Sequence, residues 1–182
     1  MVQIRIENIV ASTSLTDNLD LSSIALALEG CEYEPEQFPG AIWRLKQPKT
    51  ALLLFRSGKV VCTGGKSQTD VEQAIQMVSK EIRKTGQRIT SKPEIIVQNI
   101  VASSGLGSEI NLNEIAIAMG LDHVEYEPEQ FPGLVYRMDD PRVVVLLFGS
   151  GKLVCTGAKK PSDVEKAVKK IEKELRVAGL LR

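Results

Sequence analysis

One nine-residue stretch, EYEPEQFPG, occurs twice in the chain, at 32–40 and again at 125–133. A second duplicated stretch follows each copy, LLLFRSGKVVCTGGK from Leu52 and VLLFGSGKLVCTGAK from Val145. Because Asn8 matches Asn99, 91 residues further on, the spacing is too long for a stacked solenoid repeat. The chain is therefore expected to contain two related halves, 1–91 and 92–182, with a pseudo-twofold axis and a polar linker at 85–93.

Each half has the same predicted order of elements: a β-branched strand, an amphipathic helix, three strands and a long closing helix. Ser67 with Asp70, and Ser162 with Glu165, have the spacing of a helix N-terminal capping box. The helices have one apolar face each, so they can cover only one side of the strands. The predicted class is α+β, with two pseudo-symmetric halves and one sheet face left without helices. The expected strands are 2–11, 41–46, 50–56, 59–63, 95–102, 134–138, 143–148 and 152–156, and the expected helices are 21–28, 67–84, 112–119 and 162–178.

Composition excludes several classes of protein. With 43% hydrophobic and 25% charged residues, the 182-residue chain is typical of a globular protein. No apolar run is long enough to span a membrane and no charged leader precedes one, so membrane insertion and secretion are not expected. Three cysteines without CxxC spacing indicate reduced thiols in an intracellular protein. The zero formal net charge by itself gives no support to nucleic-acid binding.

The sequence gives little support to an enzyme. A phosphate-binding P-loop ending at Lys66 would need a glycine where Val60 stands. His123 is the only histidine, so a His-based metal cluster or duplicated His catalysis is excluded, and no cofactor is expected. The duplicated glutamates of the two EYEPEQFPG loops have no nucleophile in the sequence around them, and partner docking explains them better.

The helix-free face combines apolar side chains with isolated amides and hydroxyls, which is an unusual lining for a surface in water. Such a face, surrounded by duplicated cations, suits the DNA minor groove, where A·T pairs present only acceptors and G·C adds an amine. Cations around it would meet phosphates. As alternatives, the Asn residues satisfy backbone groups at a turn, and the Thr residues are ordinary strand ends. The face is formed by Asn8, Val10, Leu53, Val61 and Thr63 and their repeat mates Asn99, Val101, Leu146, Val154 and Thr156.

All four phenylalanines of the chain stand at repeated positions. Phe38 and Phe131 lie between prolines in the EYEPEQFPG loops, and Phe55 and Phe148 precede the two SGK turns. A single strand phenylalanine is most often a core residue. Four duplicated ones, two of them in loops, favour a role at the surface, because aromatic wedges are used to kink DNA from the minor groove.

These motifs resemble the TATA-box-binding protein family, in its archaeal form, over essentially the whole chain. The resemblance rests on QNIV at Gln98 and ENIV at Glu7, on both YEPEQFPG copies, on both F-x-SGK-x-VCTG copies and on YRM at Tyr136. It implies a saddle-shaped antiparallel sheet with helices on the convex side. It also implies a general initiation factor that binds and kinks the TATA box and recruits transcription factor B and RNA polymerase. Its place would be the archaeal cytoplasm at the nucleoid, or a eukaryotic nucleus.

The resemblance also assigns roles to individual positions. Intercalation is implied for Phe38 with Phe55 and for Phe131 with Phe148. Base contacts are implied for the Asn and Thr residues of the helix-free face, with its Val and Leu residues on the groove floor. Docking of transcription factor B is implied for Glu127, Glu129 and Gln130. The implied phosphate contacts are Arg44, Ser57, Lys59, Lys66, Arg137, Ser150, Lys152 and Lys159.

Two departures from the family pattern and one alternative accompany this interpretation. Glu36 and Gln37 stand where eukaryotic members carry basic residues, and the chain ends in AGLLR without the acidic tail common in archaeal members. The alternative is a module that binds protein or single-stranded RNA with the same face and stacks bases on the phenylalanines. An exposed apolar face also predicts self-association without DNA.

Overall fold

The computed structural model describes residues 3–120 and 122–181, and the chain divides into two compact units. Unit 1 comprises Met1–Glu7 and Asn99–Arg182, and unit 2 comprises Asn8–Gln98. Strands β1 (Arg5–Ser14) and β6 (Ile96–Gly105) each contribute residues to both units. The division of the chain into halves at 1–91 and 92–182 stays a prediction that concerns the repeat.

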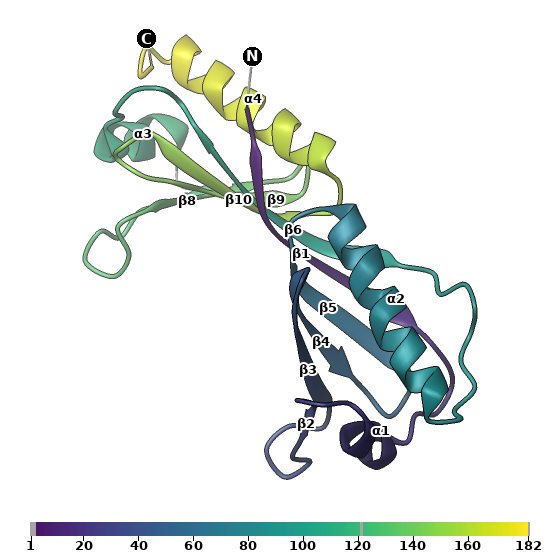
Figure 1. Ribbon diagram of the computed structural model, residues 1–182. Helices are drawn as coiled ribbons and strands as arrows, with labels where there is room; N and C mark the ends of the chain where they lie inside the picture. The colour runs from purple at the N-terminus through teal and green to yellow at the C-terminus, as the bar shows by residue number, and fades with distance from the viewer. Residues whose placement is uncertain (1–2, 121, 182) are drawn as a thin grey trace. The chain divides into compact units, whose positions relative to one another are not determined.

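Unit 2 contains an antiparallel sheet with the strand order β2-β3-β4-β5-β1. The long helix α2 lies along one face of its strands (Figure 1), and the short helix α1 lies beside β2. The α2 helix begins after Ser67, whose hydroxyl accepts a hydrogen bond from the Asp70 backbone N–H at 3.1 Å. The elements are α1 (Leu21–Ala27), β2 (Glu32–Tyr33), β3 (Ala41–Lys46), β4 (Lys49–Leu54), β5 (Lys59–Gly65) and α2 (Gln68–Lys84).

Unit 1 repeats this arrangement with the strand order β6-β10-β9-β8-β7. Helix α4 covers one face of the strands, as α2 does in unit 2 (Figure 1). The α+β class, with antiparallel strands and helices on one face in each repeat, is confirmed. The elements are α3 (Leu112–Met119), β7 (Val124–Glu125), β8 (Leu134–Met138), β9 (Val143–Leu147), β10 (Lys152–Ala158) and α4 (Pro161–Val177).

Most predicted elements are found within a few residues of their expected bounds, with three differences. The expected first strand begins at Val2, outside the described residues, whereas β1 starts at Arg5 and extends to Ser14. The short edge strands β2 and β7 were not predicted, because two-residue strands carry no periodicity. The capping box at Ser162 and Glu165 is wrong, since α4 starts at Pro161, a favourable first helical residue, without a side-chain cap.

Strand alternation and helix periodicity together create one core in each unit. On β4 and β5, Leu52, Leu54, Val60 and Cys62 have no exposed surface and face α2. Their mates on β9 and β10, Val145, Leu147, Leu153 and Cys155, are equally buried under α4. Each fully buried aliphatic side chain of this kind contributes about 1.5–3 kcal/mol to stability. The helix-facing sides of the strands thus hold the fold together.

The SGK turns have a glycine requirement that can be tested. Gly151 adopts φ 91°, and a Cβ placed there would overlap the Ser108 backbone carbonyl. Gly151→Ala is therefore expected to lower the free energy of unfolding by about 2 kcal/mol, from the left-handed backbone and the clash together. The control is Gly149→Ala, where the nearest atom would lie 3.9 Å from the new Cβ. Equal denaturant midpoints for the two variants would contradict this account.

Tyr136 links β8 to α4 and predicts an alkaline loss of stability in unit 1. Its hydroxyl donates a 2.9 Å hydrogen bond to Glu174, and burial together with this carboxylate raises the Tyr136 pKa to about 12. Because the folded pKa lies above the ordinary value of 10, the stabilisation is complete below pH 10 and is lost as pH rises to 12. We expect Tyr136→Phe to cost about 1 kcal/mol at pH 7. In denaturant titrations across this range the two proteins should converge, and a constant difference would refute the ionisation.

Candidate nucleic-acid interface

Each unit has a second sheet face that no helix covers, called here the open face. In unit 2 it is formed by Asn8, Val10, Leu53, Val61 and Thr63, all half-buried. Leu53 lies directly across from Val61, and Ala51 from Thr63, so these side chains share one face. In unit 1 the half-buried mates Asn99, Val101, Leu146, Val154 and Thr156 repeat the pattern. The sequence-predicted set is thus brought together within each unit.

A β-bulge aligns the asparagine and threonine of the open face. The register between β1 and β5 shifts between Ile9 and Ala11, so β5 has one extra residue at this point. There Gly64 adopts φ 96° and its N–H donates to Asn8 Oδ1 at 2.6 Å. The Nδ2 group of Asn8 donates to Thr63 Oγ1 at 3.4 Å.

Unit 1 has the same bulge and the same hydrogen bonds. The register between β10 and β6 shifts between Cys155 and Ala158. Gly157 N–H donates to Asn99 Oδ1 at 2.6 Å, and Asn99 Nδ2 donates to Thr156 Oγ1 at 3.2 Å. The alternative in which Asn satisfies the backbone is therefore correct for one of its two polar atoms.

These bonds fix which polar atoms are left for a ligand. A backbone N–H can only donate, so the Oδ1 atom of each asparagine is committed as its acceptor. The Nδ2 group gives one hydrogen to threonine and keeps the second. The threonine oxygen accepts from asparagine, so its own proton remains to be donated. Each open face therefore presents donors amid apolar side chains, an arrangement suited to a ligand edge that carries acceptors.

The four phenylalanines form two pairs, one in each unit. The ring centroids of Phe38 and Phe55 are 5.8 Å apart with an interplanar angle of 63°. Those of Phe131 and Phe148 are 5.9 Å apart at 66°. Both are edge-to-face contacts, the geometry that aromatic quadrupoles favour. None of the four side chains is fully buried, and Phe131 is 40% exposed. The interpretation of these residues as ordinary core is not supported.

The glycine that ends each EYEPEQFPG loop provides room for its ring pair. A Cβ on Gly133 would lie 2.7 Å from a Phe131 ring carbon and 3.0 Å from a Phe148 ring carbon. At Gly40 the corresponding distances to Phe38 and Phe55 are 2.9 and 3.1 Å. These are closer than real Cβ contacts, so the glycine is part of what positions the rings.

The residues assigned to phosphate contacts are all exposed: Arg44, Ser57, Lys59, Lys66, Arg137, Ser150, Lys152 and Lys159. Two of them are ion-paired in the free protein. Arg44 lies 3.6 Å from Glu32, and Arg137 lies 2.7 Å from Glu125, the repeat mate of Glu32. Because exposed ion pairs contribute little to stability, either arginine can exchange its carboxylate for a phosphate.

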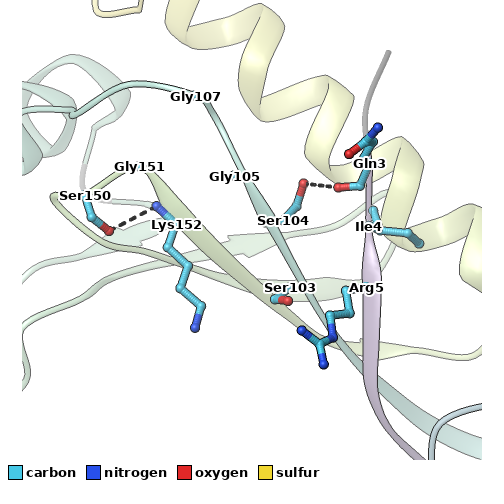
Figure 2. A pocket seen from close by; sticks show the side chains of 10 residues that line it. All are labelled: Gln3, Ile4, Arg5, Ser103, Ser104, Gly105, Gly107, Ser150, Gly151 and Lys152. Atoms are coloured by element: carbon cyan, nitrogen blue, oxygen red, sulfur yellow. Dashed lines mark hydrogen bonds between the residues drawn. The ribbon is translucent and has the colours of Figure 1, made fainter.

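Ser150 and Lys152 border a hollow of about 510 Å³ in unit 1. Figure 2 shows that Lys152 and Arg5 extend toward this space from β10 and β1. Arg5 is a cation that the sequence reasoning missed, since its repeat mate is Ile96 and duplication gave no signal. Its guanidinium is also 3.6 Å from Glu7, which accepts a 2.9 Å hydrogen bond from the Ser103 hydroxyl.

Two further hollows, one in each unit, lie beside the threonines of the open faces. The unit 2 hollow, about 440 Å³, is lined by Thr63, Arg44 and Lys49 among others. The unit 1 hollow, about 380 Å³, is lined by the corresponding residues Thr156, Arg137 and Arg142. Lys49 and Arg142 were missed, although both are cations at matching repeat positions. Also missed on the open faces were four half-buried residues of the neighbouring strands, Ile42, Ala51, Val135 and Val144.

The three residues assigned to partner docking, Glu127, Glu129 and Gln130, are all exposed in the second EYEPEQFPG loop. The loop is closed by backbone hydrogen bonds from Gln130 and Phe131 to the Glu127 carbonyl, at 2.9 and 3.0 Å. The first loop has the same bonds to Glu34. The two loops are therefore alike in backbone as well as in sequence.

Other chemistry is not prominent in the part of the chain that the structure describes. No group of three or more His, Cys, Asp or Glu residues there is placed to hold a metal ion. Burial raises the pKa of the Cys62 and Cys155 thiols to about 11, as expected for small core residues and not for reactive thiols. None of the described helices has the length and apolar character needed to cross a membrane.

Comparison with known proteins identifies the family. The model of the family described as transcription factor TFIID (or TATA-binding protein, TBP) matches the chain twice, at residues 3–85 and 94–178. The chain belongs to the TATA-binding protein family. The TATA-box-binding protein of Thermoplasma acidophilum is 62% identical over 179 residues, which cover 98% of this chain and 97% of that protein.

Other relatives of this family match equally completely. The TATA-box-binding protein of Picrophilus torridus is 60% identical over 181 residues, covering 100% of this chain and 98% of the relative. Among solved structures, Methanococcus jannaschii TBP is 54% identical, covers 96% of this chain and 98% of its own, and has a TM-score of 0.89. The resemblance inferred from the motifs is thus confirmed for the family and its archaeal form.

Proposed function

We propose that this chain is a general transcription initiation factor that binds the TATA box in the DNA minor groove and bends it. Family membership supports TATA-box binding in transcription initiation. The single observation that carries the minor-groove mechanism is the duplicated Asn–Thr pair on each open face, with its remaining donors amid apolar side chains. The proposed role is binding and recruitment, without a catalytic step.

The donor pattern favours A·T pairs. Their minor-groove edges offer only acceptors, at adenine N3 and thymine O2, whereas guanine adds the N2 amine. The second Nδ2 hydrogen of Asn8 or Asn99, and the Thr63 or Thr156 hydroxyl, can donate to such acceptors. A guanine amine would face donors or the Val and Leu side chains of the open face, and would lose its hydrogen bond to water.

Bending is assigned to the two phenylalanine pairs. Apolar wedges that unstack a base step kink DNA toward the major groove. Edge-to-face pairing holds each pair as one bulky unit at the surface, and Gly40 and Gly133 permit this arrangement. Flexible pyrimidine–purine steps cost least to kink, so deformability adds to the preference for TATA-type sequences. The exposed cations would neutralise phosphates and make the affinity depend on salt.

The experiment that tests this proposal is fluorescence measurement of bending on end-labelled duplexes at one fixed salt concentration. One duplex has a TATA-type centre, and the other has a G·C-substituted centre of the same length. Saturable binding with a large bend on the first alone is the expected result. Equal weak binding to both without a bend would exclude the proposal and favour the alternative module, which uses the half-exposed rings to stack single-stranded RNA or to bind protein.

We further propose that the second EYEPEQFPG loop docks transcription factor B, which in turn brings RNA polymerase to DNA at the archaeal nucleoid. The exposure of Glu127, Glu129 and Gln130 supports this assignment. The open faces, half-exposed without DNA, would also support self-association of the free protein.

Glu129→Arg is expected to leave DNA bending unchanged and to weaken binding of transcription factor B about tenfold, because the charge at the loop tip is reversed. The matched control is Glu36→Arg at the same position of the first loop. It should leave both DNA bending and factor binding unaffected. A gel-shift titration of the factor onto the preformed DNA complex measures the effect, and equal factor binding by the two variants would remove the docking assignment.

A further inference from the structure

The two hollows beside Thr63 and Thr156 occupy matching positions in the repeat but differ in charge. The unit 2 hollow is lined by three cations, Arg44, Lys49 and Lys66, and by no carboxylate. The unit 1 hollow is lined by Arg137 and Arg142 together with the carboxylate of Asp139. The open faces are almost identical, so this difference is a place where the two units depart from their symmetry.

The difference originates in the hairpin turns next to the hollows. In unit 2 the turn between β3 and β4 reads Lys46-Gln-Pro-Lys49, with two cations. In unit 1 the turn between β8 and β9 reads Asp139-Asp-Pro-Arg142. Asp140 is directed toward α4, where Lys166 lies 3.7 Å from its carboxylate and Lys170 donates to its carbonyl at 3.2 Å. Asp139 is exposed and lines the hollow.

The ion pairs of the arginines do not cancel this asymmetry. Arg44 and Arg137 each have a glutamate partner at matching positions, Glu32 and Glu125. After these pairs are set aside, Lys49 and Lys66 remain in unit 2, whereas Arg142 opposed by Asp139 remains in unit 1. A hollow with two uncompensated cations attracts a phosphate more strongly than one whose cation stands beside a carboxylate.

We propose that the unit 2 hollow is a backbone-phosphate subsite, with Lys49 as a contact residue, and that the unit 1 hollow is a weaker counterpart because of Asp139. This charge difference gives the chain an intrinsic preferred direction on a symmetric DNA site. The inference rests on the proposed function, since it assumes that both open faces engage one duplex. It assigns direction to the chain's own residues and requires no partner protein.

The test uses Cys31 of unit 2 as a labelling site, because it is half-buried whereas Cys62 and Cys155 are buried. A donor dye on Cys31 and an acceptor at one end of a duplex report which unit lies toward that end. The box is self-complementary, and methylphosphonates replace the phosphates beside one end of it. A second duplex carries the methylphosphonates at the other end, as an internal mirror.

The expected result is a fivefold excess, to within about a factor of two, of complexes with unit 2 at the unmodified end on both duplexes. Lys49→Gln combined with Asp139→Asn should make the two orientations equal. Lys49→Asp combined with Asp139→Lys should reverse the preference. The matched control, Lys80→Gln with Glu165→Gln, removes the same charges from exposed helix positions and should leave the preference intact.

The outcomes separate this inference from the proposed function. Wild-type protein that bends both duplexes with equal orientations would overturn the inference while the proposed function stands. A preference that persists in the Lys49→Gln and Asp139→Asn double variant would also overturn it, because the charges would then not be its cause. Wild-type protein that neither binds nor bends an unmodified TATA duplex would overturn the proposed function, and this inference with it.

Discussion

Asn99→Asp is expected to weaken binding to a TATA-type duplex on the order of a hundredfold while leaving the fold intact. The substitution keeps an Oδ1 acceptor for the Gly157 N–H, which Asn99 binds at 2.6 Å. It removes the Nδ2 donor that bonds Thr156 and that would reach a base acceptor. The carboxylate also brings a negative charge to a surface that must meet minor-groove acceptors, so attraction becomes repulsion.

Two further variants separate this chemistry from damage to the bulge. Asn99→Ala leaves the Gly157 N–H without its partner and should lower the unfolding free energy by about 1–2 kcal/mol, which the aspartate should not. Asn8→Asp is the matched change in unit 2 and should have a similar effect on binding. Affinity is measured by fluorescence anisotropy, and stability by urea titration. Tight binding by Asn99→Asp at full occupancy would show that the asparagine does not donate to the bases.

The sequence was sufficient for most of this site because duplication acted as an internal alignment. Pairs such as Asn8 and Asn99 stood out without any homologue, and strand alternation then placed Leu53 and Val61 on a common face, as the register confirms. The helix-facing residues followed from the same periodicity. Chemistry that is repeated at matched positions on regular elements was therefore readable from the chain alone.

What the sequence did not reveal depends on backbone irregularity and on differences between the repeats. The bulge at Gly64 produces the hydrogen bond to Asn8, and no pattern in the letters indicates which amide atom is committed. Arg5 escaped notice because its mate is Ile96. Asp139 was overlooked for the same reason, since a search for repeated features discards the positions where the halves differ. Those positions carry the charge asymmetry on which the direction of binding would depend.

Phe148→Ala is expected to reduce the bend of a TATA-type duplex by roughly half and to weaken binding by about tenfold or more. The ring of Phe148 is half of an edge-to-face pair, 5.9 Å from Phe131. Without it Phe131 loses the partner that holds it, and the wedge of unit 1 loses bulk and rigidity together. The second pair, Phe38 with Phe55, should still produce its own kink.

Phe55→Ala, the matched change in unit 2, should therefore leave a similar residual bend, and the double variant should bind with almost none. The backbone bond from Phe148 N–H to the Lys152 carbonyl is independent of the ring, so the turn should persist in each variant. End-to-end energy transfer on saturated duplexes measures the bend separately from the affinity. If the double variant bends DNA fully at saturation, the bend must come from the open faces and the cations, and the rings serve only to fill the surface.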